Sequence, residues 1–226
     1  MSGLSIFTSE TAADRRLKYS LELMLTVWVL GFIGHFTPLK EWPALFLYVL
    51  GAIGLAFYVA RLEGSWKPSF ITSENFGEVL KWSLSIGFFL FAMDIVNTFF
   101  YLKRGGAPMG QMEEILVGMN FLYLFPILII GEEFLWRGLM LSSLLERGMN
   151  KHWAILLTTL LFVVNHFAVA PVGFKERGML AMMALPLGII NGYVIAKTKN
   201  VWAGVLIHGI SMLAMVIDIF VIPRLV

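Results

Sequence analysis

The sequence has no cysteine among its 226 residues. This absence excludes a thiol nucleophile, thiolate metal ligands and disulfide bonds. Charged residues are also scarce, at 14%, whereas a soluble domain carries about a quarter. The net charge of +2 gives no support for a nucleic-acid partner. Residues 1–18 are polar and lack the apolar stretch of a cleavable signal peptide, so we expect none.

Apolar residues make up 58% of the chain, and runs long enough to cross a bilayer recur along its whole length. We therefore predict an all-α polytopic membrane protein. It has a polar tail at residues 1–18 and one transmembrane domain at 19–226, with no internal repeat and no soluble domain. The predicted spans are residues 19–37, 43–60, 76–102, 111–147, 152–170, 178–196 and 201–222.

The segment 111–147 is longer than a bilayer requires. About 37 residues would reach roughly 55 Å as one straight helix. Such a segment must tilt, protrude or bend, and we predict a bend at Pro126. The whole chain is then a bundle of seven or eight transmembrane helices around an internal polar cavity.

Basic residues at the span ends favour one orientation in the membrane. The side that carries the N terminus holds ten of them: Arg15, Arg16, Lys18, Arg61, Lys67, Lys81, Arg147, Lys151, Lys197 and Lys199. The other side holds six: Lys40, Lys103, Arg104, Lys175, Arg177 and Arg224. Because Lys and Arg are enriched on the cytoplasmic side, we expect a multi-pass protein of the cell (inner) membrane with a cytoplasmic N terminus.

Three charged residues stand within an otherwise apolar stretch, Ile130-Gly-Glu-Glu-Phe-Leu-Trp-Arg-Gly138. A charge at bilayer depth costs a few kcal/mol or more, so such residues indicate function. Glu133 and Arg137 have the i,i+4 spacing of a helical ion pair, which we interpret as structural. Glu132 points about 100° away and has no partner on its helix. A carboxylate in that position is suited to act as a general base.

Two intramembrane histidines accompany Glu132. Counted from one side of the bundle at 1.5 Å per residue, Glu132, His166 and His208 lie at depths of roughly 22, 21 and 12 Å. After allowance for tilt, all three can share one layer and face one cavity. A histidine opposite the carboxylate could share a proton, orient a water or stabilise an oxyanion.

These residues fall into motifs that resemble those of the CPBP family, the membrane proteases related to the CAAX-processing endopeptidase Rce. Glu132-Glu133-x-x-x-Arg137 is similar to the first motif, and Phe162-Val-Val-Asn-His166 fits the second, Phe-x-x-x-His. The third motif, His-x-x-x-Asn or Asp, reads His208-Gly-Ile-Ser-Met212. The resemblance covers about residues 110–215, which we take as the protease-like core.

The resemblance implies an all-helical intramembrane protease, without a cofactor, whose cavity opens to the cytoplasm. In that family the first Glu and the second-motif His activate water, and the third-motif His and Asn hold the oxyanion. Carried over, the catalytic residues are Glu132, His166 and His208. Met212 departs from the pattern because it cannot donate a hydrogen bond. Ser211, Asn165 or Asn191 could take its place, and the sequence does not choose among them.

Other interpretations of the same residues stay open. Glu132 could line a channel, and Arg137 could bind a substrate carboxylate. The set Glu132, His166 and His208 could hold zinc, although no H-E-x-x-H helix is present. Met212 favours a non-catalytic immunity, scaffold or transport protein.

Two further features bear on chemistry and substrate. A serine mechanism through Ser211 is weaker, since the G-x-S-x-G turn is missing. Asp94 with Asn97 indicates a packing or substrate-path polar patch. With short loops, the substrate is expected to be recognised in the bilayer, as a membrane-tethered protein or peptide that could carry a lipid.

Overall fold

The computed structural model describes residues 11–226, and this part of the chain contains helices and turns but no strand. Six helices are long and apolar enough to cross a membrane. They are α1 (Ala12–His35), α2 (Trp42–Glu63), α3 (Phe76–Lys103), α7 (Lys151–Val169), α8 (Phe174–Thr198) and α9 (Trp202–Phe220). A broken segment between α3 and α7 supplies a seventh span if it is counted as one. The predicted all-helical membrane fold is confirmed, with six or seven candidate spans in the described residues, where we predict seven or eight.

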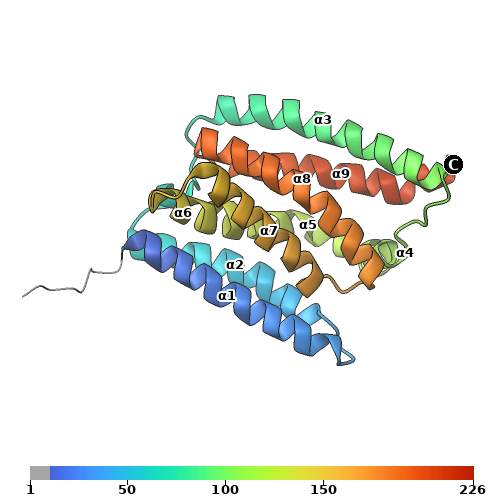
Figure 1. The fold of residues 1–226 in the computed structure, drawn as a ribbon, viewed down its shortest axis with the longest axis horizontal. Coiled ribbons are helices and arrows are strands. Elements are labelled where there is room, and N and C mark those ends of the chain that lie inside the picture. Colours follow the sequence, from blue (N-terminus) through green and yellow to red (C-terminus); the bar gives the residue numbers. More distant parts are fainter. Residues whose placement is uncertain (1–10) are drawn as a thin grey trace, which may run out of the picture.

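The helices lie roughly along one long axis (Figure 1). Helices α1 and α2 pack against each other on one side of the bundle, and α3 packs against α9 on the other. Helices α7 and α8 form the third main pair and lie between these two. The start of α1 and the C terminus are at opposite ends of the bundle.

Helix α1 begins before the predicted first span. Thr11 caps it, since its hydroxyl accepts a hydrogen bond from the Asp14 backbone N–H at 3.1 Å. The Asp14 carboxylate accepts one from the Thr11 N–H at 3.0 Å, which completes a capping box. The predicted polar tail, residues 1–18, is therefore helical from Ala12 onward, and residues 1–10 lie outside the described part.

The long segment 111–147 bends, but not at Pro126. Its two parts, Gly110–Gly118 and Phe121–Glu146, make an angle of 80°. The break lies at Asn120, whose φ of 54° is left-handed, a conformation that Asn adopts more readily than most residues. Pro126 instead occupies the first turn of the following helix, where its missing N–H has no helical partner to lose.

The remaining elements are short. The broken segment consists of α4 (Gly110–Glu113), the π-helix η2 (Glu114–Gly118), η3 (Phe121–Leu124), α5 (Phe125–Glu133), the π-helix η4 (Phe134–Leu141) and α6 (Ser142–Glu146). Two 3-10 turns complete the chain, η1 (Lys67–Ser69) between α2 and α3 and η5 (Ile222–Arg224). All eight side chains of η4 are buried, so this element runs through the centre of the bundle.

A buried arginine fastens the end of the bundle where α1 begins. The Arg16 side chain is fully buried and donates to Glu63 of α2 at 2.7 Å. It also donates to the Glu146 carboxylate and to the Ser143 hydroxyl of α6. Because these partners belong to different helices, Arg16 fixes the position of α1 against both α2 and α6.

A buried carboxylate does the same at the opposite end. Glu41, in the turn before α2, pairs with Arg177 of α8 and lies 2.8 Å from His35 Nδ1. Burial alone would raise the pKa of Glu41, but hydrogen bonds from Arg177 and His35 outweigh it and hold the pKa below its ordinary value. The carboxylate therefore stays ionised, and it ties the α1–α2 turn to α8.

Candidate active site

Glu133 occupies the centre of a polar cluster in the middle of the bundle. Its side chain is fully buried, and its Oε1 accepts a hydrogen bond from Asn191 Nδ2 of α8 at 3.1 Å. His208 Nδ1 of α9 lies 3.0 Å from the same oxygen, and Arg137 Nη1 donates to it at 3.4 Å. The interpretation of Glu133 and Arg137 as an ion pair matches this geometry, and the carboxylate has two further partners on other helices.

Glu132 faces different groups, as its position on the helix predicts. The Tyr48 hydroxyl of α2 donates to Glu132 Oε1 at 3.3 Å, while it accepts a hydrogen bond from the Trp136 indole N–H. Oε2 of Glu132 lies 3.7 Å from Nε2 of His208. The His208 ring therefore lies between two carboxylates, with Nδ1 toward Glu133 and Nε2 toward Glu132.

His166 approaches the cluster from α7. Its Nδ1 lies 2.9 Å from the Phe162 carbonyl oxygen. A carbonyl can only accept, so Nδ1 carries a proton, and Nε2 is the nitrogen left for other work. The Phe162 ring contacts His166 edge-on at 4.7 Å and lies 6.2 Å from the His208 ring. The Arg137 guanidinium covers a face of the same ring at 4.5 Å. The Phe162 ring thus lies close to His166, His208 and Arg137.

A cavity of about 380 Å³ adjoins these groups, and His166, His208, Ser211 and Met212 are among its lining residues. The prediction that both histidines share a cavity matches this structure. Glu132 is not among the lining residues; its side chain is buried, with Tyr48 and His208 against it. Most of the wall is apolar, with methionines and leucines, and polar groups are few. The cavity, which the sequence predicts to be polar, is therefore mainly apolar, with a few polar side chains in its wall.

The three candidate replacements for the missing donor at Met212 lie in different surroundings. Asn191 is held by Glu133 and by the Gly204 carbonyl, at 3.3 Å. Asn165 accepts a hydrogen bond from the Trp28 indole N–H at 3.0 Å and so faces α1. Only Ser211 of the three lines the cavity.

Sequence reasoning missed Tyr48 and Trp136. Tyr48 belongs to α2 and is 84 residues from Glu132 in the sequence. A single tyrosine in an apolar span does not form a recognisable motif. Trp136 stands inside the first motif, and its indole N–H, a donor that needs a partner when buried, was an unused signal. The ligand set of the zinc alternative is not formed, because residues 11–226 contain no group of three suitable side chains placed to hold a metal ion.

The cavity extends to Ala107 and Pro108, in the loop between α3 and α4. This loop lies at the end of the bundle opposite the start of α1 (Figure 1). The cytoplasmic N terminus favoured by the charge bias would place this end of the cavity on the outer side of the membrane. The family resemblance implies instead a cavity that opens to the cytoplasm.

The site leaves no room beside Glu133, which gives a test of its packing. A Cβ at Gly204 of α9 would lie 2.6 Å from Glu133 Oε2, whereas one at Gly209 would meet nothing within 4 Å. We expect Gly204→Ala to lower the free energy of unfolding by roughly 1–3 kcal/mol, as overpacked sites do. Gly209→Ala should be neutral or stabilising, since Ala is the better helix former.

The measurement is unfolding of the purified protein in detergent, followed by tryptophan fluorescence. Equal stability of the Gly204→Ala and Gly209→Ala variants would show that Glu133 is not held against α9 as described.

Comparison with protein families gives one match. Residues 114–214 match the model of the type II CAAX prenyl endopeptidase Rce1-like family. The matched region holds Glu132, His166 and His208 together with the helices that carry them. No curated protein and no solved structure gave a significant match. Residues 114–214, a little under half of the chain, are thus similar to the Rce1-like family of type II CAAX prenyl endopeptidases.

Proposed function

We propose that the protein is an intramembrane endopeptidase that hydrolyses membrane-anchored proteins or peptides with an activated water. One observation carries the proposal: the His208 ring is held between the carboxylates of Glu132 and Glu133 at the wall of an intramembrane cavity. The similarity of residues 114–214 to the Rce1-like family supports the reaction class. No energy source is required, because a single peptide bond is hydrolysed.

The family resemblance supports the proposed roles of Glu132, His166 and His208, and the hydrogen bonds of Glu133 support its own. Glu132, with His166, takes a proton from water as its oxygen adds to the scissile carbonyl carbon. His208 donates a hydrogen bond to the oxyanion that forms. When the C–N bond breaks, the proton passes to the leaving amine. Glu133 stays unprotonated and, with Arg137 and Asn191, fixes the His208 ring.

The substrate is proposed to be tethered to the membrane, with or without a lipid. The wall of the cavity suits apolar groups and carries no feature specific to a prenyl chain. A prenylated CAAX peptide therefore has no advantage over other membrane-anchored tails on these grounds.

A second candidate, a non-catalytic membrane scaffold or immunity protein, is favoured by Met212 alone. This residue lies in the cavity wall one helical turn from His208, where the family motif has a hydrogen-bond donor. The next experiment separates the two candidates.

Replacement of Glu132 should abolish cleavage without unfolding the protein. We expect protein termini that appear in membranes of cells expressing the wild type to vanish with Glu132→Gln, as quantified by terminal proteomics of membrane extracts. Glu133→Gln should instead lower stability by about 3–5 kcal/mol, because it leaves Arg137 as an uncompensated buried charge. If deletion gives a phenotype but no terminus depends on Glu132, the scaffold is the better account.

Ser211 is proposed as the second oxyanion donor. Ser211→Ala should lower the rate at which a Glu132-dependent terminus forms by on the order of 10²–10³, the usual cost of one such donor. Adding Met212→Asn to that variant should restore part of the rate. Asn165→Ala is the control, because its partner is Trp28 on α1. Unchanged rates in Ser211→Ala would remove this role.

We also propose that the N terminus is cytoplasmic, from the ten-to-six excess of basic residues. The absence of cysteine makes this testable with single substitutions on opposite ends, Ala107→Cys and Met149→Cys. A membrane-impermeant maleimide added to intact cells should label Ala107→Cys and spare Met149→Cys. The reverse pattern would place the N terminus outside and the Ala107 end of the cavity on the cytoplasmic side.

A further inference from the structure

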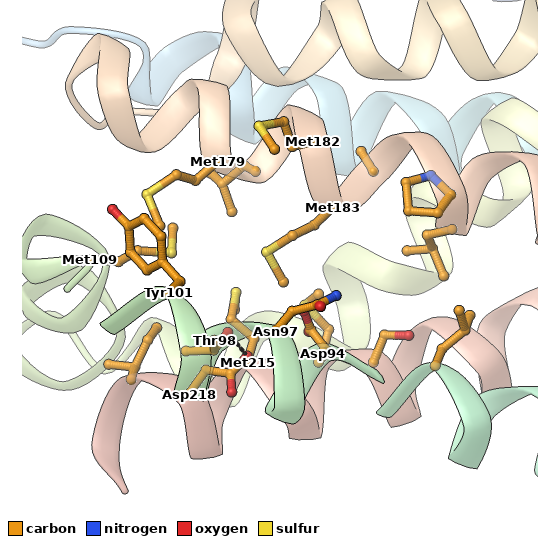
Figure 2. A pocket seen from close by; sticks show the side chains of 18 of the residues that line it. Asp94, Asn97, Thr98, Tyr101, Met109, Met179, Met182, Met183, Met215 and Asp218 are labelled. Carbon is orange, nitrogen blue, oxygen red and sulfur yellow. Dashed lines mark hydrogen bonds between the residues drawn. The ribbon is translucent and has the colours of Figure 1, made fainter. Parts of the chain in front are cut away.

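The cavity has a second polar region, away from the histidines. Figure 2 shows Asp94, Asn97 and Thr98 of α3 and Asp218 of α9 along one wall, opposite methionines of α8. Thr98 donates a hydrogen bond to Asp218 Oδ2 at 2.9 Å. The two carboxyl groups are close enough to interact electrostatically. None of these residues has a part in the reaction proposed above.

Asp218 has an oxygen without a protein partner. The residue is 9% exposed, and its Oδ1 is buried with no hydrogen-bond donor. Within residues 11–226, no lysine, arginine or histidine forms an ion pair with Asp94 or Asp218. Two carboxyl groups without a cationic partner are costly in an intramembrane cavity, and a ligand that supplies positive charge would offset that cost.

The surroundings favour an organic cation over a metal ion. The described residues hold no group of three His, Asp or Glu side chains suited to a metal. The neighbours are instead the thioether side chains of Met179, Met183 and Met215 and the ring of Tyr101. Thioethers adapt to irregular apolar groups, and an aromatic face attracts an ammonium or guanidinium group.

We propose that the Asp94–Asp218 end of the cavity is a subsite for a basic side chain of the substrate. That the cation belongs to a substrate rests on the proposed function, whereas the binding of a cation here does not. Asp218 follows His208 by ten residues on α9, about 15 Å along the helix axis. An extended peptide covers that distance in about four or five residues. The lysine or arginine is thus separated from the scissile bond by that number of residues.

The test uses photoaffinity probes rather than a natural substrate. A twelve-carbon alkyl chain with a diazirine and a terminal primary amine is compared with the same chain ending in an alcohol. Both are added to the full-length protein in nanodiscs of neutral phosphatidylcholine, and crosslinks are mapped by mass spectrometry. The amine should label cavity residues such as Met179 and Met183 at least tenfold more strongly than the alcohol.

Variants assign the preference to the carboxyl groups. Asp94→Asn and Asp218→Asn should each reduce amine labelling severalfold and leave alcohol labelling unchanged. Glu113→Gln is the matched control, an exposed acid at the same end of the bundle that does not line the cavity. Asp94 is only half-buried, so its variant keeps the test valid if Asp218→Asn fails to fold.

Two outcomes would overturn the proposal: equal labelling by amine and alcohol, or amine labelling that ignores both aspartates. Repeating the measurement with Glu132→Gln separates it from the proposed function. Amine labelling that persists there, with no Glu132-dependent cleavage in cells, would leave a cation-binding cavity in a protein that is not a protease. Cleavage without selective labelling would remove the subsite alone.

Discussion

The arrangement of the bundle depends on one buried carboxylate, that of Glu133. A fully desolvated charge is stable only when donors surround it, and here they come from three helical elements. Asn191 and His208 can reach Glu133 Oε1 only if α9 packs against α5 and α8 packs against η4, which directly follows Glu133. Gly204 allows α9 to approach closely enough for this. The same contacts orient His208, and thereby set what Glu132, the next residue, can face.

Much of this could be predicted from the sequence because two strong physical signals agree. Long apolar runs predict spans, and their ends match the helices within a few residues, except at the start of α1 and in the broken segment. Ionisable residues inside such runs are too costly to be incidental, so Glu132, Glu133, Arg137, His166 and His208 could be selected in advance. Counting residues from the helix ends was enough to place both histidines beside one cavity.

The rest depended on packing that no local pattern encodes. Because proline disrupts helix interiors, the sequence predicts a bend at Pro126. In the structure Pro126 lies at the start of a helix, and the break is at Asn120. Helix α1 starts early because Arg16 finds carboxylates on two other helices, 47 and 130 residues away. The contact between Tyr48 and Glu132 likewise joins residues far apart in the sequence, so it could not be predicted. Whether Glu132 lines the cavity is decided by the side chains that cover it, and these come from α2 and α9.

The order in which the chain is made gives the Glu133 cluster a consequence for assembly. The ribosome completes residues 121–146 before Asn191 and His208 exist. This stretch therefore leaves the translocation channel with Glu132, Glu133 and Arg137 in its interior, and with only the Glu133–Arg137 pair to offset the cost of burial. Its buried charges gain their remaining partners only when α8 and α9 have been synthesised and docked. The Glu133 cluster is thus completed late in synthesis, by helices that follow it in the chain.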